Sequence, residues 1–215
     1  MTRIYFKATR LDGTDFRTGT VDYVSLVGTG RRLALKPARE RFECCSDGVY
    51  HAADSPSETL IGGEWPCRLF EVAGSPVAQE DHKFGFRSLR VLREVEAWQA
   101  LGTNGQAVAT LIARASQLTE QEAGQLSAAR SAARYAAGSA GGDAAWFAAR
   151  STAACAAVDA AWSAAGYAAR SAGGYVAGSA AGDAAQALVV QDLITPEQFD
   201  LLYGPWRTVM DSGND

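Results

Sequence analysis

The side chains with the most obvious capacity for chemistry are cysteines and histidines in the first hundred residues. Cys44, Cys45, His51 and Cys67 are residue types that bind zinc, and Cys45 with His51 is the pairing that a thiol nucleophile would need. No Cys-x-x-Cys pair occurs, and adjacent cysteines chelate one ion poorly. We therefore predict neither a metal site nor a cysteine nucleophile, and we expect the thiols to be buried.

A second group of candidates combines a tyrosine with carboxylates on predicted strands. Gly48-Val49-Tyr50-His51-Ala52-Ala53-Asp54 precedes Leu69-Phe70-Glu71-Val72-Ala73-Gly74, and Glu94-Val95-Glu96 closes a later strand. These segments resemble the ADP-ribosyltransferases. The resemblance implies NAD bound in a cleft between two small sheets, and a carboxylate that stabilises an oxocarbenium-like state. The site residues that it implies are Lys7, Tyr50, Glu94 and Glu96.

The elements that would position these residues form a β-rich domain over residues 1–101. Strands are predicted at 4–8, 19–24, 32–35, 48–52, 67–72 and 89–95, with a turn at 11–14 and a short helix from Asp54. Asp81-His82-Lys83 is predicted to be a solvated polar turn. Residues 102–125 read as a linker with helices, the second starting at the capping box Thr119-Glu120-Gln121-Glu122.

The strongest pattern in the chain is an eight-residue repeat over residues 126–189. The segment divides into eight consecutive octads, of which the first three are LSAARSAA, RYAAGSAG and GDAAWFAA. The fourth position is Ala in all eight. Over this length an invariant position would wind almost twice around one straight helix, so a single long helix does not explain the period. The pattern is that of a repeat array.

We predict that the octads form an Ala-rich solenoid of short helical turns, each capped by Ser or Asp and ended by Gly. Longer broken helices packed through Ala, and a β-solenoid, are the alternatives. Residues 190–215 are predicted to form a cap and tail, with a helix that starts at Thr195-Pro196 and stops at Gly204-Pro205. The predicted fold class is therefore α+β.

Charge and hydropathy exclude several classes of protein. The 215 residues carry 20 Lys and Arg against 24 Asp and Glu, a net charge of −4, without the basic footprint of a nucleic-acid-binding protein. No strongly apolar stretch is long enough for a transmembrane helix or has the form of a signal peptide. We expect a cytoplasmic protein that binds neither nucleic acid nor membrane.

The repeat array offers little transfer free energy, because its apolar content is mostly methyl groups. Its aromatic side chains offer more, and they are the candidate interface residues: Tyr135, Trp146, Phe147, Trp162, Tyr167 and Tyr175. We therefore expect a homo-oligomer or a protein partner.

The whole chain is also similar to phage and actinobacterial proteins that join a domain of unknown function to short Ser/Ala/Gly-rich repeats. The similarity rests on Gly48 to Ala52, the alternating strand at 89–95 and the end of the array. It implies a phage-encoded protein acting in the host cytoplasm. The leading hypothesis is a non-enzymatic interaction or self-assembly protein without a cofactor, and the alternative is an NAD-dependent ADP-ribosyltransferase-like enzyme.

Overall fold

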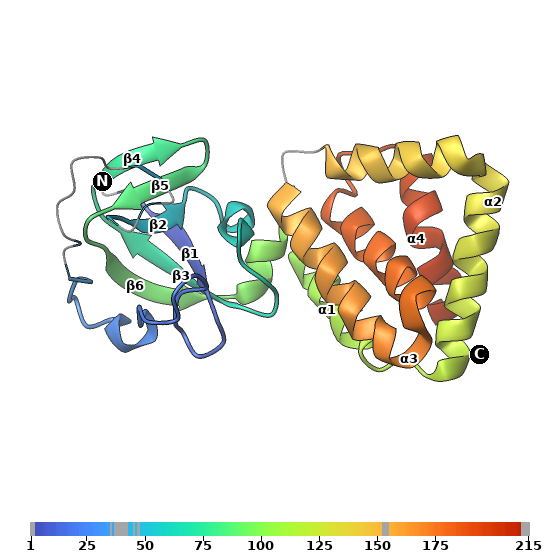
Figure 1. Ribbon diagram of the computed structural model, residues 1–215, viewed down its shortest axis with the longest axis horizontal. Coiled ribbons are helices and arrows are strands. Elements are labelled where there is room, and N and C mark those ends of the chain that lie inside the picture. The colour runs from blue at the N-terminus through green and yellow to red at the C-terminus, as the bar shows by residue number, and fades with distance from the viewer. Residues whose placement is uncertain are drawn as a thin grey trace. The chain divides into compact units, whose positions relative to one another are not determined.

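The computed structural model describes residues 3–34, 36, 43, 44, 46, 48–151 and 155–211. The chain divides into two units, Met1–Ala100 and Leu101–Asp215. The first holds an antiparallel sheet and the second holds α-helices (Figure 1), so the α+β class is confirmed.

Six strands form the sheet of the first unit, in the order β4-β5-β2-β1-β3-β6, and all neighbouring strands are antiparallel. The strands are β1 (Tyr5–Thr9), β2 (Tyr50–Ala53), β3 (Arg68–Ala73), β4 (Pro76–Glu80), β5 (Lys83–Phe86) and β6 (Arg90–Val95). Strands predicted at 4–8, 48–52, 67–72 and 89–95 correspond to β1, β2, β3 and β6. Three short 3-10 helices accompany the sheet: η1 (Val24–Leu26), η2 (Pro56–Leu60), where a short helix was predicted, and η3 (Ala97–Leu101).

Aromatic side chains build the core on one face of this sheet. The Tyr5 ring lies 5.0 Å from the Phe84 ring and 4.9 Å from the Phe86 ring, measured between centroids. Tyr23, from the loop after β1, stacks on Phe70 at 6.5 Å. All five side chains are buried, so this loop covers the face and seals it from water.

The strands predicted at 19–24 and 32–35 are wrong for the described residues. The carboxylate of Asp15 accepts hydrogen bonds from the backbone N–H groups of Thr18, Thr20 and Val21, so this segment closes a turn around Asp15 instead of extending. Arg32 makes one isolated bridge, and Leu35 lies outside the described residues.

The hairpin of β4 and β5 is not foreseen from the sequence. β4 begins with a proline, and four of its five residues are exposed, so it lacks the apolar alternation that marks a strand. Asp81 and His82 connect the two strands and are exposed, with Asp81 at φ 47°, which confirms the predicted polar turn for these two residues, whereas Lys83 begins β5.

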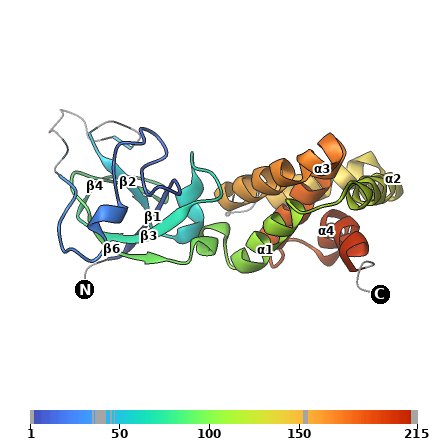
Figure 2. The same ribbon diagram turned by 90° about the horizontal axis from the view of Figure 1, so that it is seen from below.

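In the second unit the described residues form four α-helices: α1 (Gly105–Ala115), α2 (Glu120–Arg150), α3 (Cys155–Val189) and α4 (Pro196–Asp211). The predicted capping box is confirmed, since Thr119 and Glu122 bond reciprocally at the start of α2. α1, α2 and α4 all pack against α3, and Figure 2 shows α1 and α4 on the same side of it. No helix in the described part of the chain is long and apolar enough to cross a bilayer.

The octads do not form the predicted solenoid of short turns. Apart from Ser151, the octad residues that the structure describes lie in α2 and α3, which are broken at Gly138 and at Gly173–Gly174, as in the alternative of longer helices packed through Ala. Eight residues advance about 800° around a helix, so a given octad position drifts by about 80° per repeat and stays near one face only over one or two octads. The glycine breaks restart the register before the drift accumulates, which a single straight helix could not do.

The two halves of α3 fold back on each other through small residues (Figure 1). A Cβ added at Gly178 would lie 2.8 Å from the carbonyl oxygen of Gly166, and one at Gly182 would lie 3.0 Å from that of Trp162. The fourth- and eighth-position residues Ala161, Ala165 and Ala169 are fully buried. Glycine and alanine therefore permit a close approach of backbones that larger side chains would prevent.

The predicted helix stop at Gly204–Pro205 is wrong, because α4 continues through both residues to Asp211. Leu202, Pro205, Trp206 and Val209 are buried on one side of α4, which packs against α2 and α3. Tertiary packing of this apolar stripe outweighs the loss of the proline's backbone hydrogen bond.

Candidate functional site

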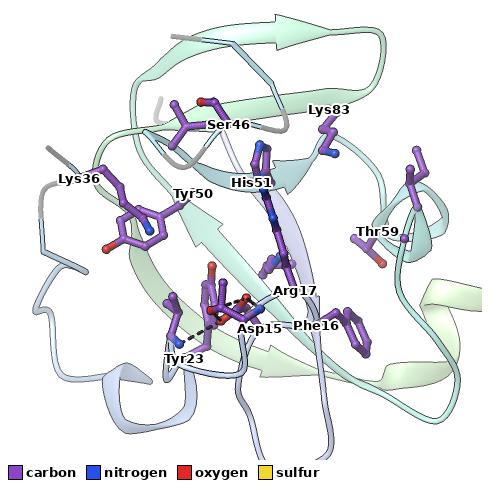
Figure 3. A pocket seen from close by; sticks show the side chains of 16 residues that line it. Asp15, Phe16, Arg17, Tyr23, Lys36, Ser46, Tyr50, His51, Thr59 and Lys83 are labelled. Atoms are coloured by element: carbon purple, nitrogen blue, oxygen red, sulfur yellow. Dashed lines mark hydrogen bonds between the residues drawn. The ribbon is translucent and has the colours of Figure 1, made fainter. Parts of the chain in front are cut away.

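A pocket of about 460 Å³ opens in the first unit, between the sheet and the loop that follows β1 (Figure 3). β1 pairs with β3 over five residue pairs but meets β2 only at Phe6 and Ala53. β2 instead pairs with β5, over four residue pairs. The pocket lies where β1 and β2 separate, so Lys7 of β1 and Tyr50 and His51 of β2 line it together.

Asp15 forms part of the pocket wall and holds the loop in shape. Its carboxylate accepts hydrogen bonds from Thr18 N at 2.7 Å, Val21 N at 2.9 Å, Thr20 N at 3.2 Å and the Thr18 hydroxyl at 2.8 Å. Burial opposes ionisation of this carboxyl, but the hydrogen bonds outweigh it and lower the pKa of Asp15 to about 2. The carboxylate is thus committed to the loop rather than to a ligand.

Basic side chains dominate the polar lining of the pocket. The chain has three lysines and 17 arginines. All three lysines, Lys7, Lys36 and Lys83, line this pocket, and Arg17 lines it too. Two of the lysines lie over aromatic rings: Lys36 Nζ is 4.6 Å from the Tyr50 ring centroid, and Lys7 Nζ is 5.7 Å from that of Tyr23. The pocket is therefore suited to an anion.

The local environment shifts the pKa values of two basic groups. Burial lowers the pKa of Lys7 from 10.5 to about 8, with Lys83 acting in the same direction and Asp15 opposing it. Burial and the neighbouring cations Lys83 and Lys7 lower the pKa of His51 to about 4, so its imidazole is neutral at pH 7. Burial likewise raises the pKa values of Tyr23 and Tyr50, which keeps both phenols protonated.

A smaller hollow of about 40 Å³ adjoins this pocket and shares Lys7, His51 and Lys83 with it. Glu58, from η2, lines the hollow, and burial raises the pKa of this carboxyl. Lys7 and His51 thus stand at the junction of two cavities.

The four residues implied by the ADP-ribosyltransferase resemblance fall into two places. Lys7 and Tyr50 line the cationic pocket, whereas Glu94 and Glu96 line a separate shallow hollow beside β6. Glu94 makes a bidentate ion pair with Arg68, at 2.8 Å from Nε and 2.6 Å from the other nitrogen. This pairing lowers the pKa of Glu94. A single sheet, rather than two small ones, carries Lys7, Tyr50 and Glu94, and Glu96 directly follows the end of β6.

The cysteines show no shared site in the described residues. Cys67 is buried, and burial raises the pKa of its thiol to about 12, which leaves it unreactive at neutral pH. Cys44 is half-buried, with its thiol 3.6 Å from the Lys83 carbonyl oxygen, and Cys45 lies outside the described residues. No cluster of three metal-ligating side chains occurs among the residues that the structure describes.

The candidate interface residues of the helical unit differ in exposure. Tyr135, Phe147, Tyr167 and Tyr175 are exposed, by 91%, 61%, 71% and 69% respectively. Trp146 is half-buried and packs edge-to-face on Phe147. Trp162 is also half-buried, and its indole donates to Asp183 at 3.3 Å while Arg130 bonds the other carboxylate oxygen at 2.7 Å. Trp162 therefore serves the internal packing of the unit.

Sequence reasoning did not identify Arg17, Lys36 and Lys83 as site residues. They are far apart in the chain and belong to no motif. One signal was available: lysine occurs only three times in a chain whose other basic residues are arginines. Comparisons with protein-family models, with curated proteins and with solved structures gave no match to this chain.

Proposed function

We propose that this is a non-enzymatic interaction protein whose N-terminal unit holds an anionic group of its partner in the cationic pocket. The observation that carries this proposal is the pocket's charge. Lys7, Lys36, Lys83 and Arg17 line it, and Asp15, the one carboxylate among the described lining residues, is occupied by hydrogen bonds from its own loop. An anion there would be attracted by several cations at once, in a partly desolvated setting where the attraction is strong.

The test is a titration with inorganic phosphate and pyrophosphate, followed by calorimetry and by thermal stability. We expect Arg17→Gln and Lys36→Gln each to weaken binding about tenfold, because a hydrogen bond to a charged group contributes about 1.5–3 kcal/mol. Arg31→Gln is the matched control, since Arg31 is exposed and does not line the pocket. Equal weakening in all three variants, or no binding at low salt, would refute a site in this pocket.

The helical unit would supply a second interface, with another protein or a second copy of the chain. Tyr167 and Tyr175 support this role: both are exposed, and Arg170 lies 5.0 and 5.4 Å from their ring centroids. Light scattering over a range of concentrations tests self-association. The double variant Tyr167→Ser/Tyr175→Ser should shift association to higher concentration, whereas Thr110→Ser on α1 should not. A monomer at every concentration would exclude the second copy.

An NAD-dependent ADP-ribosyltransferase-like activity is the second candidate. It is favoured by the presence of Lys7 and Tyr50 in one pocket whose cations suit a pyrophosphate. Against it, Glu94 is paired with Arg68 in a separate hollow. Incubation with labelled NAD and bacterial lysate distinguishes the two: binding without transfer or hydrolysis supports the interaction protein, and transfer lost in Tyr50→Ala supports the enzyme.

A further inference from the structure

The amine of Lys7 has no hydrogen-bonded or ion-paired partner among the residues that the structure describes. Lys7 lies on β1 at the junction of the two cavities and is half-buried, so part of its side chain faces the open space. Its side chain contacts the face of an aromatic ring instead, with Nζ 5.7 Å from the centroid of the Tyr23 ring. A lysine in this position is held in place without having its nitrogen occupied.

The surroundings favour the neutral form of this amine. Burial and the charge of Lys83 lower the pKa of Lys7 to about 8, so at pH 8 about half of the molecules carry a free lone pair there. An ordinary lysine at that pH is almost wholly protonated. Desolvation together with a neighbouring cation is the combination that activates nucleophilic lysines.

We propose that Lys7 is a nucleophilic amine that captures, as a reversible imine, a small aldehyde or ketone carrying an anionic group. The inference rests on the proposed anion pocket: Arg17, Lys36 and Lys83 would hold the anionic end of such a compound, while its carbonyl carbon reaches Lys7. The pocket's volume of about 460 Å³ accommodates a small molecule.

The chemistry needs no further reactant. The lone pair of Lys7 Nζ attacks the carbonyl carbon, and the C=O π electrons move to oxygen, which takes up a proton to give a carbinolamine. Loss of that hydroxyl as water forms the C=N bond, and addition of water reverses both steps. The proton that nitrogen releases passes through solvent water in the open pocket to the carbinolamine oxygen, so the exchange balances without a base from the protein.

The test uses pyridoxal 5′-phosphate as a probe that carries an aldehyde and a phosphate. The full chain is incubated with the probe and reduced with borohydride, and the adduct is located by peptide mass spectrometry among only three lysines. We expect at least tenfold more adduct on Lys7 than on Lys36 or Lys83, with the rate of formation rising as pH increases through 8. Pyridoxal, which lacks the phosphate, should react at least tenfold less.

Lys7→Arg should abolish the adduct while phosphate still binds. Lys36→Gln should still give the adduct on Lys7, but a higher concentration of the probe should be needed to form it. If Lys7→Arg fails to fold, the distribution of adduct among the three lysines of the unaltered chain still tests whether Lys7 is the nucleophile. Adduct spread evenly over the three lysines, with phosphate binding intact, would overturn the nucleophile and leave the anion pocket standing. Lys7 labelled equally by pyridoxal and its phosphate, without phosphate binding, would overturn the anion pocket instead.

Discussion

The two units of this protein bury their interiors by different means. In the first, aromatic side chains such as Phe70 and Phe84 fill the space above a sheet. In the second, Ala161, Ala165 and Ala169 are fully buried, and Gly178 lets one helical half touch the backbone of the other. A methyl group removes little apolar area from water, so the helical unit depends on close contact between backbones, where dispersion forces accumulate. We therefore expect the first unit to be sensitive to substitutions that change the shape of a core side chain. The second unit should be sensitive to substitutions that add volume where its helices meet.

The largest expected effect comes from emptying the aromatic core. Phe70→Ala removes a fully buried ring from β3 and should destabilise the first unit by about 3–5 kcal/mol. Ala169→Gly is the corresponding deletion in α3 and should cost about 1 kcal/mol. Hydrogen exchange measured by mass spectrometry shows which unit loses stability in each variant. Equal costs for the two substitutions would contradict the contrast between the units.

The next effect tests the close approach of the helical halves. Gly178→Ala places a Cβ 2.8 Å from the Gly166 carbonyl oxygen and should destabilise the second unit by about 1–3 kcal/mol. Gly124→Ala in α2 meets nothing within 4 Å and should stabilise it by up to about 1 kcal/mol. Chemical denaturation followed by circular dichroism measures both. The two glycines must give opposite signs for the packing account to hold.

A smaller loss is expected at the start of α2. Thr119→Ala removes the capping box with Glu122 and should destabilise the helical unit by about 1 kcal/mol. Thr110→Ala, on the exposed side of α1, removes a hydroxyl that bonds only within its own helix and should be close to neutral. The denaturation midpoints of the two variants are compared. An equal shift in both would show that the capping box makes no stabilising contribution of its own.

A further effect is confined to acidic pH and to the first unit. The pKa of His51 is about 4 in the folded chain, below its ordinary 6.5, so between these values the unfolded chain binds a proton that the folded chain does not. Stability should therefore fall as pH decreases from 6.5 to 4. His51→Gln should flatten this dependence, while His82→Gln, at the exposed hairpin turn, should keep it. Melting temperatures at each pH check the slope.

Sequence reasoning succeeded where local chemistry decides the structure. The caps at Thr119 and Thr195 and four strands with apolar alternation follow from neighbouring residues. It failed where distant contacts decide. The packing of α4 carries that helix through Pro205, and the hydrogen bonds of Asp15 prevent the strand at 19–24.

The octads illustrate the same limit. The eight-residue period can be read directly from the sequence. The structure that it produces depends on the breaks at Gly138 in α2 and at Gly173–Gly174 in α3, which divide these helices into shorter packed segments. Of the candidate site, Lys7 and Tyr50 were named in advance, whereas the side chains that make their pocket cationic come from three other parts of the chain. They line the space where β1 and β2 separate, together with the loop that follows β1.

The confinement of lysine to one pocket makes proteolysis a reporter of its occupancy. A protease that cleaves only after lysine can cut this chain at Lys7, Lys36 and Lys83, and every one of these bonds adjoins the pocket lining. The remaining basic residues are arginines, which such an enzyme ignores. Because Lys7 lies in the central strand β1, cleavage there requires the first unit to unfold, and protection by an added compound would report that it stabilises the folded unit.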